Sequence, residues 1–267
     1  MKKYIHHVKQ HQPLIPGMDA ISLLTEHSFP RHSHDQFGIG IVIQGTQRSW
    51  SHRGNVQASA GDIIMVNPGE IHDGQPLQGP RGWHMIFFEP DVIKQELQHD
   101  SKTRDILMSP VVTDPELSSH MRTMFDKINV PHPDSTAIEE AFILSLMRVT
   151  QYHIFSKLPL KKYTPPVILA KQYLDDCPEE KITLSQLAAL CDISRFQLIR
   201  AFSHELGITP HAYLVQSRIR LARKLLSGGK TIIDTALMTG FADQSHLTRA
   251  FQKQFGMTPG YFLSARE

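Results

Sequence analysis

The chain has 267 residues, of which 40% are hydrophobic and 20% charged, and its formal net charge is +2. This length suits two domains, and the composition is that of an ordinary globular protein. No run of eighteen apolar residues occurs, so no transmembrane helix is expected. No apolar stretch follows the basic residues at the start, which argues against a secretory signal. Two cysteines are too few for a disulfide framework, so a reducing cytoplasm is expected.

The first ninety residues predict short β-strands. Runs of β-branched and aromatic residues at 37–43, 62–66 and 83–88 are separated by glycine and proline, which is typical of a sandwich or small barrel. Helical patterns follow. Asp114 is expected to cap a helix that begins at Pro115, and a longer helix is predicted over 135–153. The longer helix packs on its own barrel, pairs with a second subunit, or does both with different stripes of its surface.

A segment rich in proline and lysine, 157–166, predicts an extended linker. It separates an expected domain at 1–160 from a second at 166–267. Everything after the linker has the periodicity of helices. From Pro166 onward the chain also carries three more basic than acidic residues, a balance that permits a nucleic-acid partner.

The last hundred residues contain an internal repeat. Arg-Ala-Phe at 200–202 recurs at 249–251, and Gly-Ile-Thr-Pro at 207–210 recurs as Gly-Met-Thr-Pro at 256–259, both with a spacing of 49. Further upstream, Thr183 and Ala188 match Thr231 and Ala236 with a spacing of 48. The second copy must therefore contain one extra residue, which we expect in its turn, around 239–241. Two copies of a short helical unit are predicted.

The first copy has the pattern of a helix-turn-helix. Thr183 can cap a helix, with Gln186 completing a capping box three residues later. A tight turn over 191–193 follows. Ser194 and Gln197 form the same pattern for the next helix, and Gly207 ends that helix.

The second copy repeats this pattern with different capping residues. Thr231 and Asp243 are the expected N-caps, Gly240 permits the turn, and Gly256 ends the second helix. We also expect the first helix of this copy to bury Ile232, Ile233, Ala236 and Leu237.

The second helix of each copy leaves a polar face outward. Helix-turn-helix proteins place the first turns of such a helix in the major groove, where these side chains can reach base edges or a thymine methyl. The helix between the copies, 211–226, is expected to hold the two recognition helices about 34 Å apart, one turn of the duplex. DNA contacts are therefore predicted for Arg195, Phe196, Gln197, Ile199 and Arg200, and for Gln244, Ser245, His246, Thr248 and Arg249.

This C-terminal part closely resembles the DNA-binding domain of AraC/XylS-type transcription regulators. The resemblance rests on Gly-Phe-Ala-Asp-Gln-Ser-His-Leu-Thr-Arg-Ala-Phe at 240–251, followed by Phe-Gly-Met-Thr-Pro at 255–259. It implies seven helices, with two recognition helices in adjacent segments of the major groove. The front half looks like the cupin-type sensor barrel that often precedes this domain, through residues 31–35 and 61–72.

Together the two resemblances imply an α+β protein, in which a cupin-like β-barrel with helices precedes an all-α domain with two helix-turn-helix units. They imply a cytoplasmic homodimer that binds double-stranded DNA at specific sequences and responds to a small-molecule effector. The family favours activation of transcription, with RNA polymerase as a further partner. No membrane partner and no cofactor are expected.

Three histidines of the front half are candidates for binding. His32 and His34 form an H-x-H pair whose side chains point the same way on a strand, and His72 on a neighbouring strand could complete a set for Zn, Fe, Mn or Ni. Cupin metal sites usually add a glutamate shortly after the pair, and residues 35–39 contain none. The alternative is that the histidines are polar contacts near a ligand or ordinary surface residues. We therefore predict no metal, and a small molecule at the barrel mouth near His32, His34, Gln44, Trp50, Glu70 and His72.

No catalytic motif stands out, since Gly-x-Ser-x-Gly, phosphate-binding glycine loops and Cys-x-x-Cys are all absent from the sequence. A cupin barrel alone could be an oxygenase or an isomerase. Such an enzyme would not need a duplicated DNA-binding unit, so we expect that the protein is not an enzyme. A third interpretation is a constitutive DNA-binding protein with an inert front domain, whose DNA affinity no ligand would change.

Overall fold

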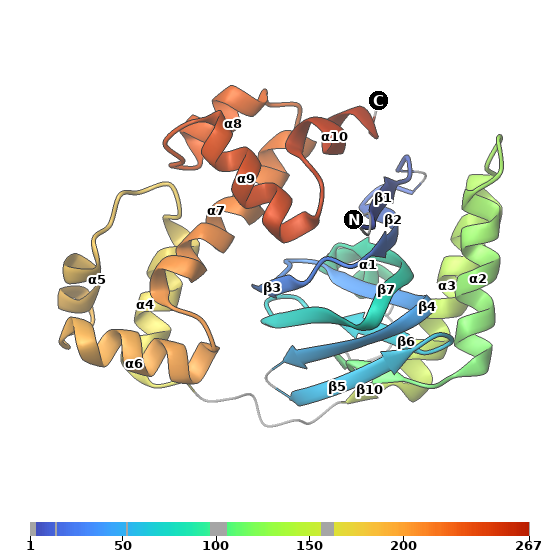
Figure 1. Cartoon of the computed structure of the whole chain (residues 1–267), viewed down its shortest axis with the longest axis horizontal. Coiled ribbons are helices and arrows are strands. Elements are labelled where there is room, and N and C mark those ends of the chain that lie inside the picture. Colours follow the sequence, from blue (N-terminus) through green and yellow to red (C-terminus); the bar gives the residue numbers. More distant parts are fainter. Residues whose placement is uncertain (1–3, 14, 52, 97–105, 156–162, 267) are drawn as a thin grey trace. The chain divides into compact units, whose positions relative to one another are not determined.

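The computed structural model describes residues 4–13, 15–51, 53–96, 106–155 and 163–266, and Figure 1 shows the whole chain. These residues form two compact units, one built largely from the first 158 residues and one largely from residues 159–264. Most of the predicted linker, 157–162, lies outside the described residues. None of the described helices combines the length and apolar character needed to cross a bilayer.

The first unit is an eight-stranded sheet with three helices. Along its main path the strands run antiparallel in the order β1-β2-β7-β4-β6-β9, while β3 pairs with β7 and β5 pairs with β4. The strands are β1 (His6–Gln10), β2 (Met18–Thr25), β3 (Phe29–His32), β4 (Phe37–Ser51), β5 (Gly54–Ser59), β6 (Ile63–Val66), β7 (His72–Phe88) and β9 (Val111–Val112). A separate pair joins β8 (Leu107–Met108) to β10 (Ile154–Phe155), and the helices are α1 (Pro90–Glu96), α2 (Pro115–Ile128) and α3 (Ser135–Tyr152).

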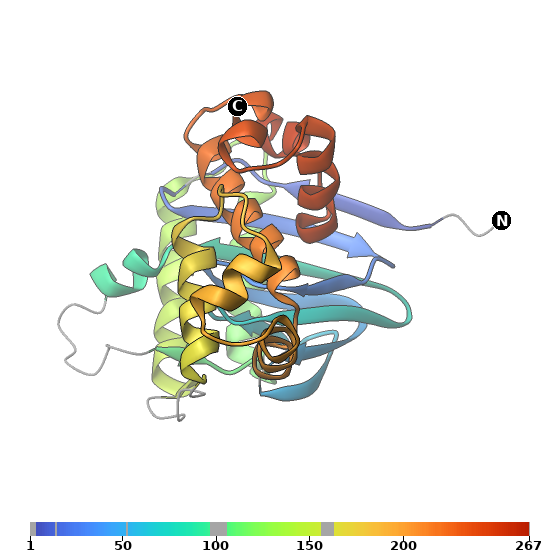
Figure 2. The same cartoon turned by 90° about the vertical axis from the view of Figure 1, so that its left-hand side faces the viewer.

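Alternation along the long strands gives the sheet two apolar faces. Ile39 and Ile41 of β4 belong to the core that includes α2 and α3, while Val42 belongs to a second apolar cluster. In β7 the same alternation places Phe88 in the first core and Phe87 in the second cluster. The two helices run side by side in both views (Figures 1 and 2). The second cluster lies on the other face of the sheet, the face that concerns ligand binding below.

Asp114 connects the two helices on this sheet. As predicted, it caps α2, accepting hydrogen bonds from the backbone nitrogens of Glu116 and Leu117. Its carboxylate also pairs with Arg148 of α3 at 2.8 Å and with His153 at 2.7 Å. Burial alone would raise the pKa of Asp114, but these hydrogen bonds outweigh burial and bring the pKa well below its usual range.

Helix α3 was expected to pack on its own barrel, to pair with a second subunit, or to do both. It buries one stripe against its own sheet, and Phe142 lies edge-on against Phe88 of β7 with ring centroids 5.3 Å apart. Two other apolar side chains, Leu144 and Met147, are 43% and 60% exposed. The helix therefore packs on its own unit while leaving a second stripe outward.

The C-terminal part of the chain, which the structure describes from residue 163 to residue 266, contains helices and no strand. Its seven helices agree with the number that the family resemblance implies. They are α4 (Pro165–Asp176), α5 (Leu184–Leu190), α6 (Arg195–Leu206), α7 (Pro210–Ser227), α8 (Ile232–Met238), α9 (Gln244–Phe255) and α10 (Pro259–Ser264). The α+β class, with a β-rich unit followed by an all-α unit, is thus confirmed.

One packing prediction in this unit is wrong. Ile233 and Leu237 of α8 are 60% and 67% exposed, whereas Thr235 and Ala236 are buried. The helix has only seven residues, about two turns, so one narrow stripe can face the core. Ile233 and Leu237 share a stripe four residues apart that is rotated away from the buried one.

Candidate nucleic-acid interface and histidine cluster

The first helix-turn-helix is positioned by a capped turn. Asp192 adopts a left-handed conformation, with φ of 52°, and the backbone nitrogen of Ile193 bonds back to the carbonyl of Ala188. Ser194 then begins α6 through the predicted capping box, in which its hydroxyl accepts from the backbone of Gln197 and the Gln197 side chain accepts from the backbone of Ser194. Both ends of the turn are thereby fixed by local hydrogen bonds.

The second helix-turn-helix uses the same turn with one insertion. Gly240 has φ of 75°, and the backbone nitrogen of Phe241 bonds to the carbonyl of Ala236, 48 positions after the corresponding bond in the first copy. The cap of α9, Asp243, follows its counterpart by 49 positions and accepts from the backbone of His246 at 2.7 Å. The extra residue is therefore Ala242, just after the stretch in which it was predicted.

The residues predicted to contact DNA lie on the outer faces of α6 and α9. All ten are exposed except Thr248, which is partly exposed, whereas Leu198, Phe202, Leu247 and Phe251 of the same helices are buried. Phe196 is 73% exposed in the first turn of α6, where an apolar side chain can meet a thymine methyl. The two faces thus have the composition and position of recognition surfaces.

Gln197 has a local partner as well as an exposed position. Its side-chain oxygen accepts from the backbone nitrogen of Ser194 at 2.9 Å as part of the capping box. The amide NH2 group is then the end of this side chain that can donate to a base edge. Sequence reasoning assigned both roles to Gln197, and the structure places the cap bond on its carbonyl oxygen.

The long helix α7 is tied to both copies by Arg218. Its guanidinium donates to the carbonyls of Pro178 and Glu180, which precede α5, at 2.7 and 3.0 Å. It also donates to the carbonyl of Gly240, in the turn before α9, at 2.7 Å. Burial lowers the pKa of Arg218, which nevertheless stays charged at neutral pH. One side chain therefore links the segment before the first helix-turn-helix to the turn of the second.

Asp175 connects helix α4 to the long helix α7. From α4 it accepts hydrogen bonds from Tyr213 at 2.9 Å, Ser217 at 3.2 Å and Arg220 at 2.7 Å, all three on α7. Lys171 pairs with the same carboxylate at 2.7 Å. Sequence reasoning missed these roles of Asp175 and Arg218, because their partners other than Lys171 are 22 to 45 positions away and follow no periodic pattern.

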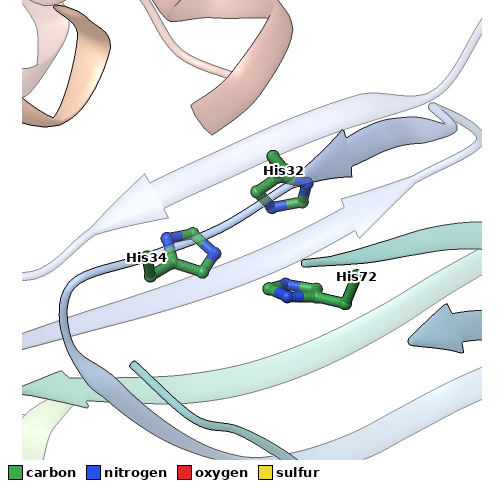
Figure 3. A group of neighbouring side chains, drawn as sticks. All are labelled: His32, His34 and His72. Atoms are coloured by element: carbon green, nitrogen blue, oxygen red, sulfur yellow. The ribbon is translucent and has the colours of Figure 1, made fainter. Parts of the chain in front are cut away.

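The three candidate histidines come together. His32 ends β3, His34 follows two residues later, and His72 begins β7, and their ligand nitrogens all lie within 4.8 Å of one another. Figure 3 shows the three rings turned toward one another. The rings of His34 and His72 have centroids 5.2 Å apart, and His34 also lies 5.0 Å from the ring of Phe87.

Backbone carbonyls fix the protonation of two of these rings. The Nδ1 atom of His32 lies 2.7 Å from the carbonyl of Pro30, and that of His72 lies 2.9 Å from the carbonyl of Glu70. A carbonyl only accepts, so Nδ1 carries the proton in both rings and Nε2 carries the lone pair. Burial lowers the pKa of His72 against the opposing influence of Glu70 and Asp73, so its imidazole is neutral at physiological pH.

The other residues predicted around the ligand are not part of this cluster. Gln44 is exposed where β4 changes register against β7, and Trp50 neighbours Ser51, the strand partner of His72, so its side chain points to the opposite face. The carboxylate of Glu70 accepts from Asn67 at 2.7 Å instead of joining the histidines. The structure thus brings together three of the six predicted residues.

The two units match known families in the order in which they occur. Residues 16–147 match the AraC-like ligand binding domain, and residues 187–265 match a helix-turn-helix domain. The thermoregulatory protein LcrF of Yersinia pestis is 31% identical over 242 residues, which cover 85% of this chain and 88% of LcrF. The transcriptional regulator YbfI of Bacillus subtilis is 27% identical over 225 residues, covering 82% and 81% of the two chains.

A solved structure shares the fold over the full length. ToxT of Vibrio cholerae, in a structure with an unsaturated fatty acid bound, aligns with a TM-score of 0.52 and 12% identity, and the alignment covers 100% of this chain and 98% of ToxT. At this identity the likeness concerns the fold alone. The matched domains, the full-length relatives and the paired helix-turn-helix units agree: this chain belongs to the AraC/XylS-type family of DNA-binding transcription regulators.

Proposed function

We propose that this regulator binds a specific DNA site with α6 and α9 together, and that a small molecule in its β-rich unit controls this binding. The DNA-binding domain comprises residues 166–267 and the sensing domain residues 1–160. The observation that carries the proposal is the pair of exposed recognition faces, each fixed by a capped turn and both tied to α7 through Arg218. Such fixed spacing is needed for two helices to enter adjacent segments of one major groove.

The exposed side chains divide into two kinds of contact. Arg195, Arg200 and Arg249 are exposed arginines, which can bind guanine edges or phosphates. The other members combine amide, hydroxyl, imidazole and apolar groups, as direct readout of a mixed sequence requires: Phe196, Gln197, Ile199, Gln244, Ser245, His246 and Thr248. Both helices therefore contribute to sequence choice in this proposal.

The sensing half of the proposal rests on the face of the sheet opposite α2 and α3. There Val42, Met85 and Phe87 form an apolar cluster, in which the ring of Phe87 lies against the ring of His34. An apolar surface with a few converging polar groups is the usual composition of a small-molecule site. The fatty acid bound to ToxT is a precedent for a small ligand in this fold.

The remaining parts of the proposal concern partners. The exposed stripe of α3, with Leu144 and Met147, is a surface through which two copies can pair. We expect an activator, which acts on RNA polymerase in the cytoplasm where the chromosome lies, and the relative RhaS of Escherichia coli carries the name of a transcriptional activator. Catalysis has no part in the proposed function.

The DNA half is tested by selecting bound sequences from a random oligonucleotide pool with the full chain. Binding of the selected duplex by Arg249→Ala is then measured by fluorescence anisotropy at fixed salt. Loss of a base-reading arginine costs about 1–3 kcal/mol, so we expect a 5- to 150-fold weaker complex. Lys253→Ala removes the same charge from the last turn of the same helix and is the matched control. Equal affinities of the two variants would contradict the placement of Arg249 in the groove.

The sensing half is tested with ligands found by a thermal-shift screen of a small-molecule library. Each compound that stabilises the protein is added to the anisotropy measurement with the selected duplex. A compound that binds and changes DNA affinity supports ligand control. Compounds that bind the β-rich unit and leave DNA affinity unchanged would favour the constitutive DNA-binding protein with an inert front domain.

A further inference from the structure

The histidine cluster at the end of β3 and the start of β7 carries an inference beyond the small-molecule site, and it departs from the expectation that no metal binds there. We propose that His32, His34 and His72 form a site for one divalent transition-metal ion of the zinc, nickel or cobalt type, and that this ion is part of the signal sensed by the β-rich unit. The site itself stands on the geometry of the three rings. Only its regulatory role rests on the function proposed above.

The spacing of the nitrogens suits a metal after small side-chain movements. Zinc–imidazole bonds are about 2.0–2.1 Å long, which puts two nitrogens of a tetrahedral site about 3.3 Å apart. The three ligand nitrogens already lie within 4.8 Å of one another. Rotation about side-chain bonds can close the remaining difference, since each ring needs to move by about 1 Å.

The hydrogen bonds behind the rings are those of metal-binding histidines. A ligating imidazole usually donates its second N–H to a carbonyl or carboxylate, which fixes its tautomer and its direction. His32 and His72 do this through Nδ1, toward the carbonyls of Pro30 and Glu70. The lone pair of each ring is then on Nε2, so a metal bond would form at that atom.

The composition of the cluster selects among metals. Its three ligands are imidazole nitrogens, and the Glu70 carboxylate, one oxygen of which accepts from Asn67, is not a member of the group. Imidazoles suit zinc, nickel, cobalt and copper, whereas calcium, magnesium and manganese prefer oxygen ligands. Three protein ligands leave at least one coordination position for water or for a small ligand with a donor atom.

A metal ion bound at this cluster would connect two parts of the chain that lie far apart in the sequence. His32 and His34 lie on either side of the end of β3, while His72 is about forty positions away at the start of β7. His32 is buried, and the other two are partly exposed, so an ion can enter and exchange. Binding would cross-link the connection between β3 and β4 to the start of β7, and this linkage is how occupancy can bias the conformation of the unit.

The test begins with the full chain after treatment with a chelator. Zinc(II) binding is measured by isothermal titration calorimetry, and stoichiometry by elemental analysis after dialysis. We expect one ion per chain, and a loss of affinity of more than about 100-fold in His34→Gln, since changes even behind the ligands cost 10- to 100-fold. His7→Gln, which removes an exposed histidine of β1, is the control and should bind as the wild type does. Equal binding by all three proteins, or none by the wild type, would overturn the site.

A second variant guards against a loss of binding caused by misfolding. His34→Cys keeps a metal ligand at the same position, so it should retain binding and give cobalt(II) a thiolate charge-transfer band that the wild type lacks. A cobalt spectrum with no such band would show that residue 34 does not touch the ion.

The regulatory role is tested by repeating the DNA titration with and without zinc(II). A change in affinity of the wild type that is absent in His34→Gln supports the metal as signal. Stoichiometric zinc binding with unchanged DNA affinity would overturn that role and leave the site. Specific DNA binding without any zinc binding would overturn the site and leave the proposed DNA-binding function intact.

Discussion

Replacing Arg218 by methionine should weaken DNA binding although Arg218 lies on no recognition helix. The substitution keeps most of the side-chain volume and removes the three donors that reach Pro178, Glu180 and Gly240. Without these donors, the side chain at position 218 no longer links the turn before α9 to the segment before α5. The two recognition helices would then lose part of the fixed spacing that lets them bind as one unit.

The size of the effect follows from the environment of the three hydrogen bonds. A hydrogen bond to a charged group contributes about 1.5–3 kcal/mol. The bonds to Pro178 and Gly240 are partly buried, and the bond to Glu180 is exposed and can be replaced by water. Counting only the two partly buried bonds at the lower value, we expect the unfolding free energy of the helical unit to fall by about 3 kcal/mol.

The assay separates this effect from a simple loss of charge. Lys224→Met removes one positive charge from the exposed side of the same helix and is the matched control. Urea unfolding is followed by far-UV circular dichroism, because both tryptophans, Trp50 and Trp83, lie in the β-rich unit and do not report on the helices. DNA affinity is measured on the selected duplex. If Arg218→Met and Lys224→Met behave alike in both measurements, Arg218 does not couple the two copies.

Two further predictions concern a turn and a buried histidine. Gly240→Ala should destabilise the helical unit by about 3 kcal/mol in urea unfolding, because the backbone there is left-handed and the new Cβ would lie 2.4 Å from the carbonyl oxygen of Glu179. The control is Gly229→Ala, where the backbone is also left-handed but the space around it is open. This control should lower the unfolding free energy by only about 1 kcal/mol. Burial, with the charges of Lys9 and His84, lowers the pKa of His11 to about 4, so the unfolded chain binds more protons than the folded one between pH 6.5 and 4. Stability of the β-rich unit should therefore be complete above pH 6.5 and fall by about 2 kcal/mol from pH 7 to 5, as followed by tryptophan fluorescence, and a flat profile, or one that His11→Gln leaves unchanged, would contradict this.

Local chemistry was predictable from the sequence, because a cap or a left-handed glycine acts within a few residues. Thr183, Ser194 and Asp243 cap helices as predicted, and Gly207 and Gly256 end them in the left-handed conformation. The sequence located the inserted residue only approximately. The hydrogen bonds that place it at Ala242 are made by the backbone, and the identity of the side chains does not predict them.

Contacts between distant segments were not predictable in the same way. The exposure of Ile233 and Leu237 depends on which stripe of a two-turn helix meets the core, and apolar character alone does not decide this. Gln44 follows a change of register in β4, and such irregularities alter which face a residue occupies. The H-x-H pair could be recognised in the sequence, because side chains along a strand alternate with a period of two. Its approach to His72, however, depends on the pairing of β3 with β7.

The rigidity of the helical unit constrains how an effector can act on it. Effectors typically shift binding at a second site by 1–3 kcal/mol of coupling free energy. Arg218 joins the two copies through charge-assisted hydrogen bonds, and Asp175 joins α4 to α7 with three donors. Breaking either set costs about as much as the whole coupling free energy. We therefore expect an effector to change how the helical unit is presented to DNA, or how two copies pair, while the spacing of α6 and α9 within the unit stays the same.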